Sequence, residues 1–221
     1  MRIFGQESRL KAAICWMLTC NDGRKDGRNT DYLRQEAKWR ELDPPLFDHL
    51  RATVHSQKKR GVSCLHNSDL LPDCIFYDQI LEDDRTVQEN YFKNLETKVQ
   101  RADYVFFDPD NGLEVKSTSL GRRNSSKYLY WKFLVPIYKS RKSVLIYQHF
   151  PRLKRKKFIQ ERIKEIQERT GSYATVAIET PYTIFFLAAH EYHMAEFQKG
   201  LDAIKKKWIS DKIVVCKYSF V

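Results

Sequence analysis

Apolar residues recur along the chain in short runs divided by polar, turn-forming segments, a pattern that predicts strands alternating with helices. Runs rich in β-branched and aromatic residues indicate buried strands. The strands are expected at 12–19, 62–66, 73–80 (or a turn that enters a helix), 103–108, 143–147, 173–179, 182–189 and 213–220. Apolar positions three and four residues apart indicate amphipathic helices. The helices are expected at 30–50 with a break at Pro44-Pro45, 87–99, 127–138 with Ser125-Ser126 as cap, 156–169 and 194–208.

This alternation is typical of an α/β protein with helices on both faces of its sheet. We therefore expect a single domain over 1–221: a doubly wound, mostly parallel, Rossmann-like sheet with an antiparallel strand pair near its C-terminus. Ligands bind such sheets at the carboxyl ends of the strands. Three polar clusters follow expected strands: Asn21-Asp22-Gly23, Asp108-Pro109-Asp110-Asn111-Gly112, and Gln148-His149.

The composition narrows the class of protein. Apolar residues make up 42% and aromatic residues 13%, which is enough to bury a core. No apolar run approaches the roughly 18 residues of a membrane span, and no secretory signal is visible. The five cysteines show no C-x-x-C spacing, which argues against a disulfide framework or a cysteine-based zinc site. We expect a cytoplasmic protein with no membrane partner.

The positive charge is concentrated in one part of the chain. Residues 116–169 hold 16 Lys and Arg against three Glu, in a chain whose net charge is +11. This asymmetry predicts nucleic acid, RNA or DNA, as a partner. The alternative is a solvated helix start, but cations there oppose the helix macrodipole. The expected phosphate-binding residues are Lys127, Arg152, Lys154, Arg155, Lys156 and Lys157.

The segment Asp108–Glu114 places three carboxylates, an amide and a glycine directly after a buried strand. A plain Asx-rich turn is the simplest explanation. The segment also resembles the Asp-Pro-Pro-Tyr catalytic loop of class I S-adenosylmethionine-dependent methyltransferases that act on adenine amino groups. Asp108 and Pro109 match its first two positions, whereas Asp110 and Asn111 replace the proline and the aromatic residue. The order of elements over roughly 100–190 is similar to that fold as well.

The methyltransferase resemblance implies methyl transfer to a base amino group, with S-adenosylmethionine as cofactor. Asp108 would orient the target amine, and the expected catalytic residues are Asp108, Asp110, Asn111 and His149. The histidine is a natural proton carrier near neutral pH. The expected cofactor-binding residues are Asn21, Asp22 and Gly23. In such methyltransferases an acid after the second strand binds the ribose hydroxyls, and Asp69, which follows the strand expected at 62–66, matches that position.

Two other hypotheses stay open. Asp22, Asp108, Asp110 and Glu114 could bind Mg²⁺ or Mn²⁺ in a metal-dependent nuclease, with Gln148 and Lys127 on a phosphate. Alternatively, an inactive methyltransferase-like fold could only bind nucleic acid. The motif Asp108–Glu114, together with Trp16–Gly23, also resembles an uncharacterised group of bacterial proteins, a resemblance that implies no activity.

Overall fold

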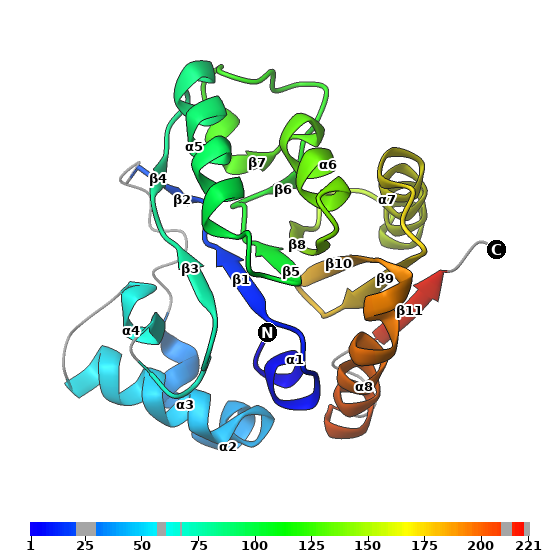
Figure 1. Cartoon of the computed structure of the whole chain (residues 1–221). Helices are drawn as coiled ribbons and strands as arrows, with labels where there is room; N and C mark the ends of the chain where they lie inside the picture. The colour runs from blue at the N-terminus through cyan, green and yellow to red at the C-terminus, as the bar shows by residue number, and fades with distance from the viewer. Residues whose placement is uncertain (21–29, 57–60, 67, 209–213, 219–221) are drawn as a thin grey trace. The chain divides into compact units, whose positions relative to one another are not determined.

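The computed structural model describes residues 1–20, 30–56, 61–66, 68–208 and 214–218 (Figure 1). The chain divides into two compact units, one of residues 1, 3–20 and 73–221 and the other of residues 2 and 21–72. The prediction of a single domain stays a prediction. Within the described residues, no helix is both long enough and apolar enough to cross a membrane.

Seven strands in the described part of the first unit form one sheet, in the order β11-β9-β10-β8-β5-β1-β3. They are β1 (Ala12–Cys15), β3 (Ile75–Tyr77), β5 (Tyr104–Phe107), β8 (Ser143–His149), β9 (Ala174–Glu179), β10 (Thr183–Ala189) and β11 (Val214–Tyr218). Strands β3, β1, β5 and β8 are parallel to one another. Strand β10 runs antiparallel between β8 and β9, and β11 is antiparallel to β9. The predicted α/β sheet with a C-terminal antiparallel pair is confirmed.

Helices cover both faces of this sheet (Figure 1). On one face, α5 (Arg85–Lys98), α6 (Trp131–Lys139) and α7 (Arg155–Thr170) pack against strand residues such as Val105 and Phe107. On the other face lie α1 (Arg2–Glu7) and α8 (Glu191–Lys207), where the Phe197 ring stands 5.5 Å from Phe4 and 5.2 Å from Tyr104. Because both faces are buried, β5 has a continuous apolar sequence instead of an alternating one.

The four parallel strands end at one edge of the sheet, which we call the carboxyl edge. The amide of Asp108 donates to the carbonyl of Cys15 at 3.0 Å, and the amide of Trp16 donates to the carbonyl of Tyr77 at 3.1 Å. His149 at the end of β8 pairs with Thr183 at the start of β10. The turn between β9 and β10 therefore lies at this edge as well.

Two short strand pairs differ from the predicted elements. The apolar run 12–19 breaks at Met17, whose φ is 46°, so that β1 is followed by β2 (Leu18–Thr19), which pairs with β4 (Ile80–Leu81). Likewise β6 (Gly112–Leu113) pairs with β7 (Tyr128–Leu129). Because residues 125–129 form η4 (Ser125–Lys127) and β7, the helix expected from 127 begins at Trp131. Ser126 does not cap it, and donates instead to the Asp83 carboxylate at 2.7 Å.

The described part of the second unit is helical. Its elements are η1 (Asp31–Arg34), α2 (Glu36–Trp39), η2 (Arg40–Leu42), α3 (Pro44–Arg51), η3 (Ala52–Ser56) and α4 (Ser63–His66). The proline pair begins α3, where Asp43 accepts a hydrogen bond from the Leu46 amide at 3.3 Å. The strand predicted at 62–66 is wrong, because a short apolar run fits a helical turn as well as a strand.

Candidate active site

The loop that follows β5 is held in place by Gln148 of β8. Gln148 is only 5% exposed. Its Oε1 accepts from the Leu113 amide at 2.9 Å, and its Nε2 donates to the carbonyls of Asn111 and His149, each at 2.9 Å. Gly112 has a φ of +108°, and a Cβ there would lie 2.3 Å from Gln148 Cδ. The Gln148 amide is therefore occupied by the loop and is not free for the phosphate contact that the nuclease hypothesis gave it.

Asp108 is the partly buried acid of this loop. Within the described residues its carboxylate accepts no hydrogen bond, although its backbone amide is tied to β1. Burial and, to a smaller extent, the nearby charge of Asp110 together raise the pKa of Asp108 to about 7. An acid with such a pKa can take up or release a proton near neutral pH.

Asp110 and Lys127 face one another across the loop. The exposed Asp110 carboxylate accepts from Thr19 Oγ1 at 3.1 Å, and Lys127 Nζ lies 3.9 Å from the same oxygen. The Lys127 carbonyl accepts from the Asn111 amide at 3.0 Å. The Lys127 side chain is 17% exposed, so this lysine belongs to the loop more than to an open cationic surface.

The structure brings the four expected catalytic residues to one edge of the sheet. Asp108, Asp110 and Asn111 share the loop, and the His149 amide donates to the Asn111 carbonyl at 3.3 Å. The His149 side chain is exposed, and the Asn111 side chain is partly so. Their roles in catalysis stay predictions.

An aromatic surface lies beside Asp108. It consists of Tyr147, which the sequence places at a strand end next to Gln148-His149, and of Phe185, which the sequence analysis missed. The pKa of Tyr147 is raised by its burial and by the charges of Asp108 and Asp110, so the hydroxyl lies near both acids. Its ring stands 5.8 Å from that of Phe185, which is 6.2 Å from Phe106. The register of the strands explains the position of Tyr147. Phe107 pairs with Ile146, so the next residues of the two strands, Asp108 and Tyr147, lie side by side.

Glu114, one of the alternative metal ligands, holds the start of a helix instead. Its Oε2 accepts from the amide of Trp131 at 2.8 Å, at the first residue of α6. A carboxylate is favourable there because it meets the positive end of the helix dipole and an otherwise unpaired N–H. Among the described residues no three His, Cys, Asp or Glu side chains are grouped as metal ligands. Asp22 lies outside the described residues.

Glu114→Ala is expected to destabilise the protein without any involvement of metal. The loss of the contact at the start of α6 should cost about 1 kcal/mol, or about 3 °C in melting temperature. The measurement is thermal unfolding with and without a chelator. If the chelator lowers the melting temperature of the wild type but not that of Glu114→Ala, Glu114 is a metal ligand after all.

The cofactor side of the site differs from the expectation. Asn21, Asp22 and Gly23 lie outside the described residues. Asp69 belongs to the second unit and follows the helix α4, so the reasoning that placed it after a strand no longer applies. The acid that follows the strand beside β1 is the exposed Asp78, directly after β3. The sequence did not indicate Asp78, because the prediction of a strand at 62–66 made that segment the second strand.

The basic cluster, residues 152–157, follows β8 at the carboxyl edge. Its side chains are all exposed, and α7 begins within it at Arg155. No side chain caps the N-terminus of this helix. The five expected phosphate-binding residues of this cluster are therefore accessible, as the sequence analysis assumed.

No protein-family model, curated protein sequence or solved structure matches the chain. The arrangement of the described residues is therefore the basis for assigning a function to the site. It is the carboxyl edge of an α/β sheet, with a partly buried acid, an aromatic surface and an exposed basic cluster.

Proposed function

We propose that this protein is a nucleic-acid-modifying enzyme that transfers a methyl group from S-adenosylmethionine to an amino group of a base. The observation that carries the proposal is Asp108, an acid without a hydrogen-bond partner among the described residues and with a pKa of about 7. Such a group can accept a hydrogen bond from an amine and then its proton at neutral pH.

The topology supports a methyltransferase-like fold. From β1 the chain adds β3 on one side and then β5 on the other, so the strand order reverses between β1 and β5. Ligands of open α/β sheets bind at such a switch point. Asp108 follows β5 and is bonded to β1 there. The return of β10 between β8 and β9 also agrees with the antiparallel pair that the resemblance implies.

Five described residues of the site would have a role in this reaction. Asp78 would bind ribose hydroxyls of the cofactor, because it follows the strand beside β1. When bound, the cofactor supplies the methyl group. Asp108 orients the amine and takes up its proton. Tyr147 and Phe185 offer their rings to the base, and the exposed His149 can carry the proton to water.

Calorimetric titration with S-adenosylmethionine tests the cofactor part of the proposal. We expect micromolar binding that weakens about tenfold in Asp78→Ala, since a hydrogen bond to a charged group is worth about 1.5 kcal/mol. Glu82→Ala removes another exposed acid and should leave the affinity unchanged. Transfer from labelled cofactor to mixed RNA and DNA should follow.

Three results would contradict part or all of the proposed function. Oligonucleotide binding without cofactor binding would favour the binding-only hypothesis. Cleavage that a chelator stops and Mn²⁺ restores would favour the nuclease. Cofactor binding that is equally strong in Asp78→Ala and Glu82→Ala would remove Asp78 from the cofactor site.

A further inference from the structure

Exposed aromatic, apolar and basic side chains lie on the β9–β10 turn and at the start of α7, two segments that a hydrogen bond of Arg155 links. We call this surface the edge patch: Leu153, Lys154, Arg155, Lys156, Lys157 and Tyr182. We propose that the edge patch binds single-stranded nucleic acid, with an unpaired base stacked on Tyr182 and neighbouring phosphates on the cations. Its use as the substrate surface for Asp108 rests on the proposed function, but the binding itself does not.

Arg155 joins the two parts of the edge patch. Its Nη2 donates to the Pro181 carbonyl at 2.8 Å, and its guanidinium stands 4.5 Å from the centre of the Phe150 ring. Thr180 Oγ1 accepts from the amides of Tyr182 at 3.3 Å and Thr183 at 2.9 Å. These hydrogen bonds stabilise the backbone of the turn that carries the exposed Tyr182.

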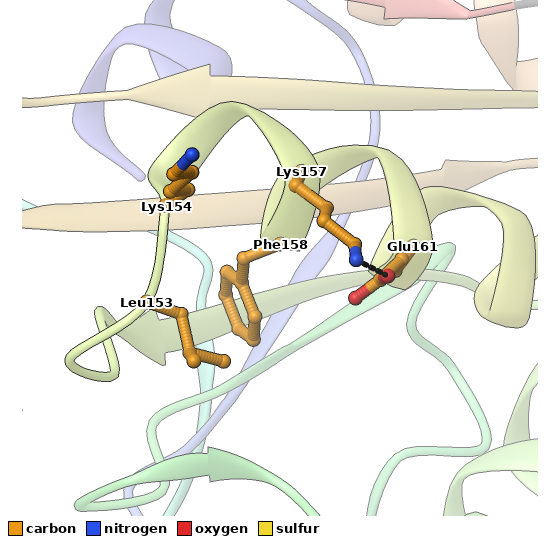
Figure 2. A pocket seen from close by; sticks show the side chains of 5 residues that line it. All are labelled: Leu153, Lys154, Lys157, Phe158 and Glu161. Carbon is orange, nitrogen blue, oxygen red and sulfur yellow. Dashed lines mark ion pairs between the residues drawn. The ribbon is translucent and has the colours of Figure 1, made fainter.

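The apolar members of the edge patch are unusually open to solvent. Tyr182 is 71% exposed and Leu153 is 65% exposed, the two highest values among the large apolar side chains described. Leu153 and Phe158 also line a shallow hollow with Lys154, Lys157 and Glu161 (Figure 2). Exposed apolar surface of this kind, next to cations, is typical of a binding site.

The charges around these side chains favour a polyanion. No Asp or Glu occurs from Ser143 to Gln160. Lys157 has an acidic neighbour in Glu161, at 3.8 Å, and this ion pair is exposed to solvent. Three cations occupy the first turn of α7, where the helix dipole disfavours them. Phosphates would relieve this repulsion and could also accept from the uncapped amides of the helix.

The exposed ring favours a single strand over a duplex. In a duplex the faces of the bases are covered by stacking, so only an unpaired base can lie against Tyr182. Base stacking of this kind tolerates any sequence, and the cations contact the backbone of any strand. The edge patch is therefore expected to select strandedness more than base identity.

Fluorescence anisotropy with labelled 20-nucleotide strands of DNA and of RNA, and with the matching duplexes, tests the inference on the full chain without cofactor. Single strands should bind about tenfold more tightly than duplexes at equal salt. Tyr182→Ala should weaken single-strand binding about tenfold, whereas Tyr182→Phe should retain it. Lys154→Ala and Lys156→Ala should each flatten the slope of log affinity against log salt by about 0.7.

Tyr173→Ala is the matched control. Tyr173 is 48% exposed and precedes β9, at the opposite end of that strand from the turn. Equal binding of duplex and single strand, or equal losses in Tyr182→Ala and Tyr173→Ala, would overturn the inference. Single-strand binding that depends on Tyr182 but brings no methyl transfer would overturn the proposed function and leave the edge patch standing.

Discussion

Asp108→Ala is expected to lower methyl transfer at least about 100-fold, the usual contribution of a positioned acid or base, and to stabilise the folded protein at pH 8. The gain in stability follows from the raised pKa. Burial moves the pKa of Asp108 from 3.8 to about 7, so the folded state binds this proton more tightly than the unfolded state. Its contribution to stability therefore falls as the pH rises from about 4 to about 7 and is constant above that range.

The size of this effect can be set by the linkage relation. A change in pKa from 3.8 to about 7 corresponds to about 4 kcal/mol, and solvent screening at this partly buried site reduces the expected effect to about 2 kcal/mol. Removal of the carboxyl group should raise the melting temperature at pH 8 by about 6 °C and have no such effect at pH 4. Thermal unfolding at both pH values measures it, with Glu82→Ala as the exposed control.

Asp108→Asn separates the two roles of the acid. The amide keeps an acceptor for the amine but cannot take up its proton. A rate close to that of the wild type would show that orientation is sufficient, whereas a loss equal to that of alanine would show that proton removal matters. Full activity in Asp108→Ala would exclude Asp108 from the reaction.

Gly112→Ala is expected to be the most destabilising single substitution in the loop. The backbone φ of +108° disfavours any side chain, and the new Cβ would lie 2.3 Å from Gln148 Cδ. Gln148 must then give up its hydrogen bonds to Leu113 and Asn111 while it stays buried. The expected cost is about 3–4 kcal/mol, or about 10 °C in melting temperature.

Gly171→Ala is the matched control for backbone strain alone. Gly171 has a φ of +69°, and a Cβ there would meet nothing within 4 Å. It should cost about 1 kcal/mol. In a double-mutant cycle, Gly112→Ala with Gln148→Ala should be less destabilising than the sum of the two single changes, because the clash disappears. Additive effects would show that the side chain of Gln148 is not what makes Gly112→Ala destabilising.

The elements that the sequence predicted well are those with a local signal. The apolar run of β5 and the spacing of apolar residues in α5 identify these elements without knowledge of the fold. The polar clusters directly after β5 and at the end of β8 likewise follow from the rule that strand ends carry ligand-binding residues. Parallel pairing then explains why Asp108 and His149 lie at one edge.

The errors arose where long-range contacts decide the outcome. Glu114 looked like a ligand among acids, but the start of α6 packs against it from 17 residues away. Asp69 was predicted as the ribose-binding acid instead of Asp78 because the helical second unit, residues 21–72, separates β1 from β3. A simple alternation of strand and helix does not include such an insertion. Phe185 was missed because it comes from β10, and only its pairing with Tyr147 shows that it lies at this site.

The hydrogen bonds of Gln148 to the loop also set the order in which the site can form. In the loop of Asp108, the amide of Leu113 donates to the side chain of Gln148, which lies 35 positions later. A growing chain that has emerged from the ribosome only as far as α6 carries every acid of the motif but lacks the strand that positions them. Because contacts of long sequence separation form slowly, the site is expected to appear late in synthesis, and truncation before β8 should leave the motif without its geometry.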